Sequence, residues 1–180
     1  MRNSRWMALW SLLLVSALSY AQGDLEKALE KELLCAGNDQ SSSLVHADSG
    51  KDNRALKAAG AVIKFDDEGP YNNFVYRFAK PLTVFGMPLW SVEQYVGEGG
   101  VTLSAEVSGD AAAFARSIQA KRPTAKDGRH FFLADDVVYL KKMALPAGQK
   151  GEPAVVVIGV TDKQKAAQRF YVGCYQQMEL

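Results

Sequence analysis

The spacing of apolar residues changes along this chain, and each change marks an expected element. Over 24–36, apolar side chains recur every three or four residues, which predicts an amphipathic helix that Gly37 ends. A polar loop over 39–51 and a short helix over 52–59 are expected next. From Ala61 onward, apolar residues recur at alternate positions, which is typical of strands with one buried face.

Strands are expected over most of the remaining chain. The clearest is Val101–Val107, where apolar and polar residues alternate strictly, as in antiparallel sheets with one solvent-exposed face. One helix follows, capped by Ser108 or Asp110 and stopped at Pro123. The almost wholly apolar run 154–160 is placed centrally in the sheet. The other predicted strands are 61–65, 74–78, 82–85, 92–96, 131–133 with 137–140 (separate, or one bent strand) and 170–176.

This order of elements predicts an α+β fold with an antiparallel sheet of about six to eight strands and helices mostly on one face. We expect a single domain over 22–180, because no repeat or low-complexity linker divides it. Within it, 22–60 is a helical lead-in, and 61–180 supplies the sheet plus one helix. The alternation of strands and helices that nucleotide-binding sheets show is absent.

The first 21 residues have the pattern of a secretory signal peptide. Arg2 and Arg5 precede the apolar run Met7–Leu18, and the small residues Ser19 and Ala21 occupy the positions that signal peptidase reads. We therefore expect cleavage after Ala21 and a periplasmic or secreted protein. A permanent membrane anchor is the alternative, although the apolar run is near the short limit for a bilayer core of about 30 Å.

Export changes the expectation for the two cysteines, Cys35 and Cys174. Disulfides form and persist in oxidising compartments. Cys35 lies on the flank of the apolar face of the first helix, and Cys174 shares a strand face with Phe170 and Val172. Both side chains thus point inward, which predicts a disulfide that ties the N-terminal helix to the last strand. By loop-closure entropy, such a long loop gives at most about 5 kcal/mol of stabilisation.

The charge balance argues against a polyanionic partner. The full chain carries 21 lysines and arginines against 20 aspartates and glutamates. Without Arg2 and Arg5, 19 basic side chains face 20 acidic ones, a net charge of −1 with neutral histidines. A near-neutral chain with mixed signs has no electrostatic footprint for nucleic acid, so no nucleic-acid partner is expected.

Candidate catalytic chemistry is sparse. The chain has two histidines, His46 and His130, far apart and without further ligands at metal-binding spacing, so neither a metal site nor a cofactor is predicted. His130 with Asp135 or Asp136 is the best pairing of a general base with an orienting carboxylate. This pairing is the basis for an alternative function, a periplasmic hydrolase.

The stretch from Lys80 to Trp90 is apolar around two prolines and a glycine. One interpretation is a core bend between two strands. The other is an apolar surface for a partner, because proline limits strand pairing while methionine and tryptophan suit contact surfaces. The partner-surface interpretation uses Phe85, Met87, Leu89 and Trp90.

The run Pro81–Gly86, followed by the Val101–Val107 strand and a capped helix, resembles small exported proteins of Gram-negative bacteria that have no assigned function. The resemblance covers Phe74–Ile118. It implies a periplasmic location and supplies no catalytic residues.

The resulting hypothesis is an exported, non-enzymatic interaction module of the bacterial envelope or secretome. Its partner would be another protein of the envelope or the host. After processing, the chain itself would have no stable membrane anchor. Besides the hydrolase, a carrier of a small ligand or lipid is an alternative, which would need an apolar cavity between the sheet and its helices.

Overall fold

The computed structural model describes residues 22–36, 53–66, 72–97, 100–130, 134–145 and 153–177. The predicted signal peptide, the 39–51 loop and the predicted 131–133 strand lie outside these residues. No helix in the described ranges is long and apolar enough to cross a membrane.

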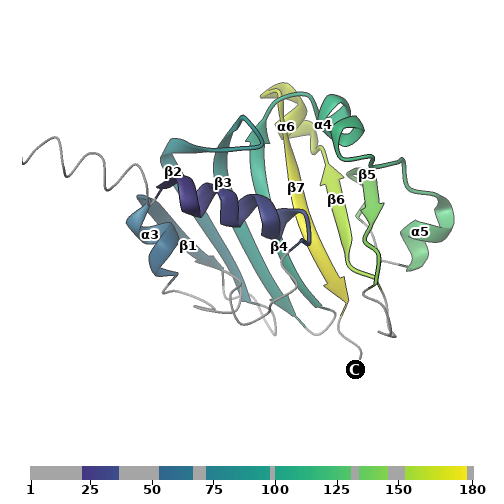
Figure 1. The fold of residues 1–180 in the computed structure, drawn as a ribbon, viewed down its shortest axis with the longest axis horizontal. Coiled ribbons are helices and arrows are strands. Elements are labelled where there is room, and N and C mark those ends of the chain that lie inside the picture. Colours follow the sequence, from purple (N-terminus) through teal and green to yellow (C-terminus); the bar gives the residue numbers. More distant parts are fainter. Residues whose placement is uncertain are drawn as a thin grey trace, which may run out of the picture.

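The chain folds into one sheet with helices packed on it (Figure 1). A helix over 22–33 comes first and is here called the 22–33 helix. The elements after it are α3 (Arg54–Ala58), β1 (Ala61–Asp66), β2 (Asn72–Val84), β3 (Met87–Gly97), β4 (Gly100–Ser108), α4 (Ala111–Ser117), α5 (Ala125–His130), β5 (Val137–Lys142), β6 (Val155–Gly159), α6 (Asp162–Ala166) and β7 (Arg169–Gln177).

The sheet has seven strands in the order β1-β2-β3-β4-β7-β6-β5, and every neighbouring pair is antiparallel. The predicted α+β fold with an antiparallel sheet is therefore confirmed. β6 lies inside the sheet between β7 and β5, and all five of its residues are buried, as its apolar composition predicts.

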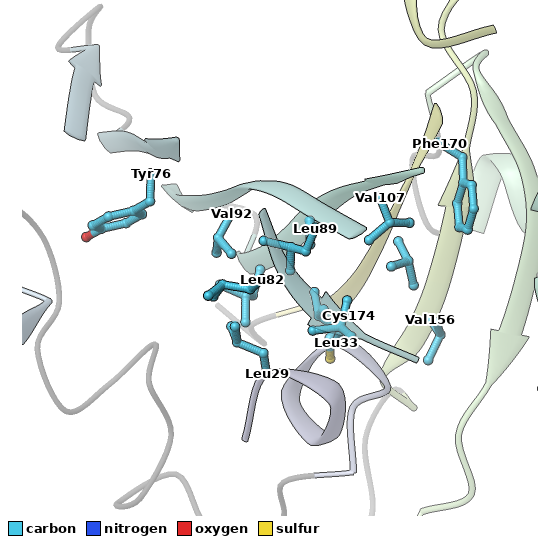
Figure 2. Packing of buried hydrophobic residues seen from close by; sticks show 14 of the residues in the cluster. Leu29, Leu33, Tyr76, Leu82, Leu89, Val92, Val107, Val156, Phe170 and Cys174 are labelled. Carbon is cyan, nitrogen blue, oxygen red and sulfur yellow. The ribbon is translucent and has the colours of Figure 1, made fainter. Parts of the chain in front are cut away.

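One face of the sheet holds the main core. Leu25, Leu29 and Leu33 of the 22–33 helix are buried in this cluster together with apolar residues of β2, β3, β4 and β7. Figure 2 shows Leu29 and Leu33 with their neighbours in the cluster. Leu56 of α3 and Phe114 of α4 join the same cluster. These helices cover the core face, whereas α6 buries none of its residues.

Two glutamates of the 22–33 helix bind the end of β2. β1 pairs with β2 only up to Phe78, so no described strand pairs with the last residues of β2 on that side. The carboxylate of Glu26 accepts a hydrogen bond from the backbone N–H of Thr83 (2.8 Å). The Glu30 carboxylate accepts one from Phe85 (2.5 Å).

The predicted disulfide between Cys35 and Cys174 is confirmed. The two Cα atoms are 5.1 Å apart, and 139 positions of sequence separate them. Cys35 lies in the turn after the 22–33 helix, and Cys174 lies on β7 near the middle of the sheet. The bond therefore attaches the first described helix to the last described strand.

Two expectations for the later chain need correction. The expected separate strand over 82–85 is instead the end of β2, which continues through Pro81 with an irregular register. One helix was expected after residue 61, but the structure also contains α5 and α6. Both short helices begin at a threonine whose hydroxyl accepts from the backbone N–H three residues later, Thr124 for α5 and Thr161 for α6.

Candidate functional site

The face opposite the main core, here called the second face, carries the more polar side chains. On β4 it presents Glu106 and Ser108, which alternate with the buried Ala105 and Val107. A smaller apolar cluster lies there on β6, where Val155 and Val157 pack with Val137, Tyr171 and Tyr175. The second face is thus partly apolar and partly charged.

Trp90 sits where the register of β3 shifts against β4. On one side of it, Leu89 pairs with Val107 of the core face. On the other side, Ser91 pairs with Glu106 of the second face. Trp90 is therefore an extra residue, a β-bulge, and bulges re-aim side chains.

The pairing of β3 with β2 shifts at the same place. Arg77 pairs with Ser91 and Leu82 pairs with Leu89, so the residues 78–81 of β2 lie opposite Trp90 alone. Pro81, which lacks a backbone N–H, falls inside this irregular part, where the ladder does not need that donor. Both ladders are therefore interrupted around Trp90.

Contacts from β4 and β7 hold the Trp90 ring on the second face. Its indole N–H donates a hydrogen bond to the hydroxyl of Ser108 at 2.7 Å. The guanidinium of Arg169 lies over the ring, 4.3 Å from its centroid, which is a cation–π arrangement. The ring is half-buried, so it is fixed in position and still reaches the surface.

Glu106 holds the Arg169 guanidinium by an ion pair. A nitrogen of the Arg169 guanidinium binds Oε1 of Glu106 at 2.7 Å. The other carboxylate oxygen accepts a hydrogen bond from the Gln164 side chain of α6 at 3.2 Å. Strands β3, β4 and β7 and helix α6 thus share one connected polar network.

A cleft of about 270 Å³ opens at this network and is here called the Trp90 cleft. Arg77 from β2 and Lys163 from α6 are exposed at its wall. It is lined by Arg77, Phe78, Trp90, Ser91, Glu106, Lys163, Gln164, Ala167 and Arg169. Among these residues, only Trp90 is a site residue that the sequence predicts. The others lie on separate strands and a helix, and periodicity does not give the strand order.

The structure separates the four residues predicted as a partner surface. Leu89 is fully buried in the main core, as Figure 2 shows. Phe85 and Met87 pack against that core, and the Phe85 ring lies 4.9 Å from the Phe114 ring of α4. Trp90 alone lies on the second face. A partner contact at these residues stays a prediction, and the geometry concentrates it on Trp90.

The predicted base and carboxylate pair remains untested. His130 is the last residue of α5, and its side chain lies outside the described part of the structure. Asp135 is exposed, whereas Asp136 accepts a hydrogen bond from the Tyr171 hydroxyl at 2.9 Å. Burial and this bond raise the pKa of Tyr171 above its usual range. Asp136 therefore already has a structural role.

Two wider and more open hollows lie beside α4 and α6. Their volumes are about 730 Å³ and 620 Å³, and both are lined by Asp110, Ala111, Val160 and Lys165. Both lie at the surface, in contrast to the apolar cavity between sheet and helices that a carrier would need. Among the described residues, no three histidine, cysteine or carboxylate side chains cluster as a metal site.

No family model matches the chain, and neither a curated protein nor a solved structure is significantly similar to it.

Proposed function

We propose that this chain is an exported interaction protein that recognises another protein through its second face, at the Trp90 cleft. The observation that carries the proposal is the placement of Trp90. A tryptophan is held half-buried between Ser108 and Arg169, at a point where both strand ladders are interrupted. Tryptophan and arginine are the residue types that most often dominate the energetics of protein interfaces.

The contrast between the two faces supports the proposal. The core face is covered by the 22–33 helix, α3 and α4, whose apolar side chains fill it. The second face presents Trp90 and, further along β3, Tyr95, which is 36% exposed. Aromatic side chains at the surface of a rigid sheet offer contact area at little cost in conformational entropy.

The disulfide supports the exported location. Cys35 and Cys174 form a bond that a reducing cytosol would not maintain in most proteins. Together with the pattern of the first residues, the disulfide supports a partner in the bacterial envelope or outside the cell.

Site-specific photo-cross-linking in the producing cell tests this function. A photoreactive phenylalanine analogue replaces Tyr95 on the second face, and in a matched variant it replaces Lys31, which is exposed on the 22–33 helix. We expect a discrete protein adduct at position 95 and none at position 31. Adding Trp90→Ala to the position-95 variant should abolish the adduct.

The Trp90→Ala variant must first be shown to fold, by its melting temperature and its intact disulfide. If it does not fold, Trp90→Phe is used, which keeps a ring but removes the indole N–H. Adducts of equal intensity at positions 95 and 31, or an adduct that persists in the folded Trp90 variant, would contradict the proposed surface.

A further inference from the structure

We propose that the Trp90 cleft binds an acidic segment of the partner protein, through at least two of its carboxylates. This inference rests on the proposed function and names the chemistry of its partner. Arg77, Lys163 and Arg169 line the cleft, and Glu106 is the one carboxylate among its lining residues. The lining therefore carries two net positive charges, although the whole chain is close to neutral.

Glu106 does not neutralise the two exposed cations. One of its oxygens is bound by Arg169 and the other by the Gln164 side chain. The carboxylate thus serves to hold Arg169 over the indole ring. Because only one guanidinium nitrogen of Arg169 is used in this pair, other N–H donors of its planar fork remain for a second anion.

Arg77 and Lys163 are the two exposed cations at the wall of the cleft. Within the part of the chain that the structure describes, neither side chain forms an ion pair or a hydrogen bond. They come from different elements, β2 and α6, yet line the same cleft. Two like charges brought to one concave site repel each other, and an anionic ligand removes that repulsion.

The size and the wall of the cleft favour side chains of a protein over a cofactor. Its volume of about 270 Å³ is just below the range of roughly 300–1,000 Å³ typical of small-molecule sites. One or two carboxylate side chains of a peptide fit such a space. The half-buried Trp90 ring supplies an apolar wall for the methylene groups of glutamate.

Trp90 fluorescence measures this binding directly. The full chain contains three tryptophans, Trp6, Trp10 and Trp90. Trp6 and Trp10 lie in the predicted signal peptide, so the processed chain that starts at Gln22 carries Trp90 as its only tryptophan. We expect an end-blocked hexaglutamate peptide to change the Trp90 emission saturably. Inorganic phosphate should bind about tenfold more weakly, because it offers one anionic group where the peptide offers several carboxylates.

A double variant locates the charge. Arg77→Ala with Lys163→Ala should weaken hexaglutamate binding about tenfold, since it removes both exposed cations. Lys31→Ala with Arg54→Ala removes the same charge from exposed helix positions outside the cleft and should leave the affinity unchanged. Added salt should weaken binding to the parent protein and have less effect on the cleft double variant.

Three results would overturn the inference: no saturable response to hexaglutamate, phosphate binding as tightly as the peptide, or equal weakening by the two double variants. None of these affects the cross-linking result, because an adduct at position 95 requires a partner but not an acidic one. Conversely, hexaglutamate binding without an adduct would establish the acidic ligand class and refute the proposed surface.

Discussion

Glu30 accepts a hydrogen bond from the backbone N–H of Phe85, and this contact joins the 22–33 helix to the end of β2. Glu26, one turn earlier, accepts from Thr83 in the same way. Four helical residues rise about 6 Å, and two strand residues rise about 6.6 Å, so the two spacings match. The helix thus supplies acceptors where β2 has no described strand on that side.

Replacing Glu30 with alanine should lower the free energy of unfolding by about 1–3 kcal/mol, because the Phe85 N–H loses its partner in a part-buried position. Glu30→Gln keeps an acceptor oxygen and should cost clearly less. Urea unfolding followed by circular dichroism measures both values. Equal losses for the two variants would show that the acceptor oxygen is not what matters.

Removing the disulfide should lower the free energy of unfolding by about 2–5 kcal/mol. The variant is Cys35→Ser with Cys174→Ser, and the parent protein in a strong thiol reductant should show a similar loss. Thermal and urea unfolding measure the effect. Because the double variant lacks the bond, the reductant should leave it unchanged, and a further loss would point to a different cause.

Asp127 should make stability depend on pH in acid. Hydrogen bonds from Lys142 and Thr124 hold the pKa of the Asp127 carboxyl well below its usual value of 3.8. As the pH falls, the Asp127 carboxyl is therefore protonated in the unfolded state at a higher pH than in the folded state. The resulting contribution to stability is complete above the unfolded pKa and is lost as the pH falls toward the lower folded pKa.

The comparison with Asp127→Asn isolates this contribution. Unfolding free energies of the two proteins should differ most near neutral pH and converge in acid. Urea unfolding at a series of pH values gives the difference. A gap that stays constant from neutral pH to strongly acidic pH would rule out the ionised carboxylate as the source.

Tyr171 should act at the other end of the pH scale. Burial, followed by its hydrogen bond to Asp136, raises the pKa of the Tyr171 phenol above its usual value of 10.0. The phenol therefore favours the folded state below pH 10.0 and loses this contribution as the pH rises toward the folded pKa. Tyr171→Phe should be less stable at neutral pH and lose less stability in alkali.

Phenolate absorbance checks this expectation. In the folded parent protein, Tyr171 should ionise at higher pH than an exposed tyrosine, and Tyr171→Phe should remove the latest part of the titration. Burial also raises the pKa of Tyr175, so part of the late ionisation should remain in the variant. Unfolding curves at neutral and alkaline pH give the change in stability. If the absorbance lost on substitution instead falls around the usual pKa of 10.0, Tyr171 ionises like an exposed phenol and the prediction is wrong.

Local patterns were enough to predict much of this fold. Strict alternation over Val101–Val107 gave β4, helical spacing gave the 22–33 helix, and two inward-facing cysteines gave the disulfide. α5 and α6 were not predicted, although each carries a helix-start signal. Thr124 with Asp127 and Thr161 with Gln164 stand at capping-box spacing. These helices are too short to show an apolar stripe.

The Trp90 cleft could not be predicted from the sequence for a different reason. Periodicity shows which face of a strand a residue occupies, but it does not show which strand lies beside it. Arg169 reaches Trp90 because β7 pairs with β4, a long-range neighbour relation. Proline at position 81 predicts an interruption between two strands, whereas β2 continues past it through an irregular segment.

The position of β7 has a consequence for how the protein is made. β1 to β4 are neighbours in the order of the sequence and can pair as they emerge, and β5 with β6 forms a separate hairpin. The two pieces meet only when residues 169–177 enter between them. The same step brings Cys174 to Cys35. A chain that ended shortly before β7 would therefore leave β4 and β6 as unpaired edges of two separate sheets. The seven-stranded sheet can form only after the final strand is made.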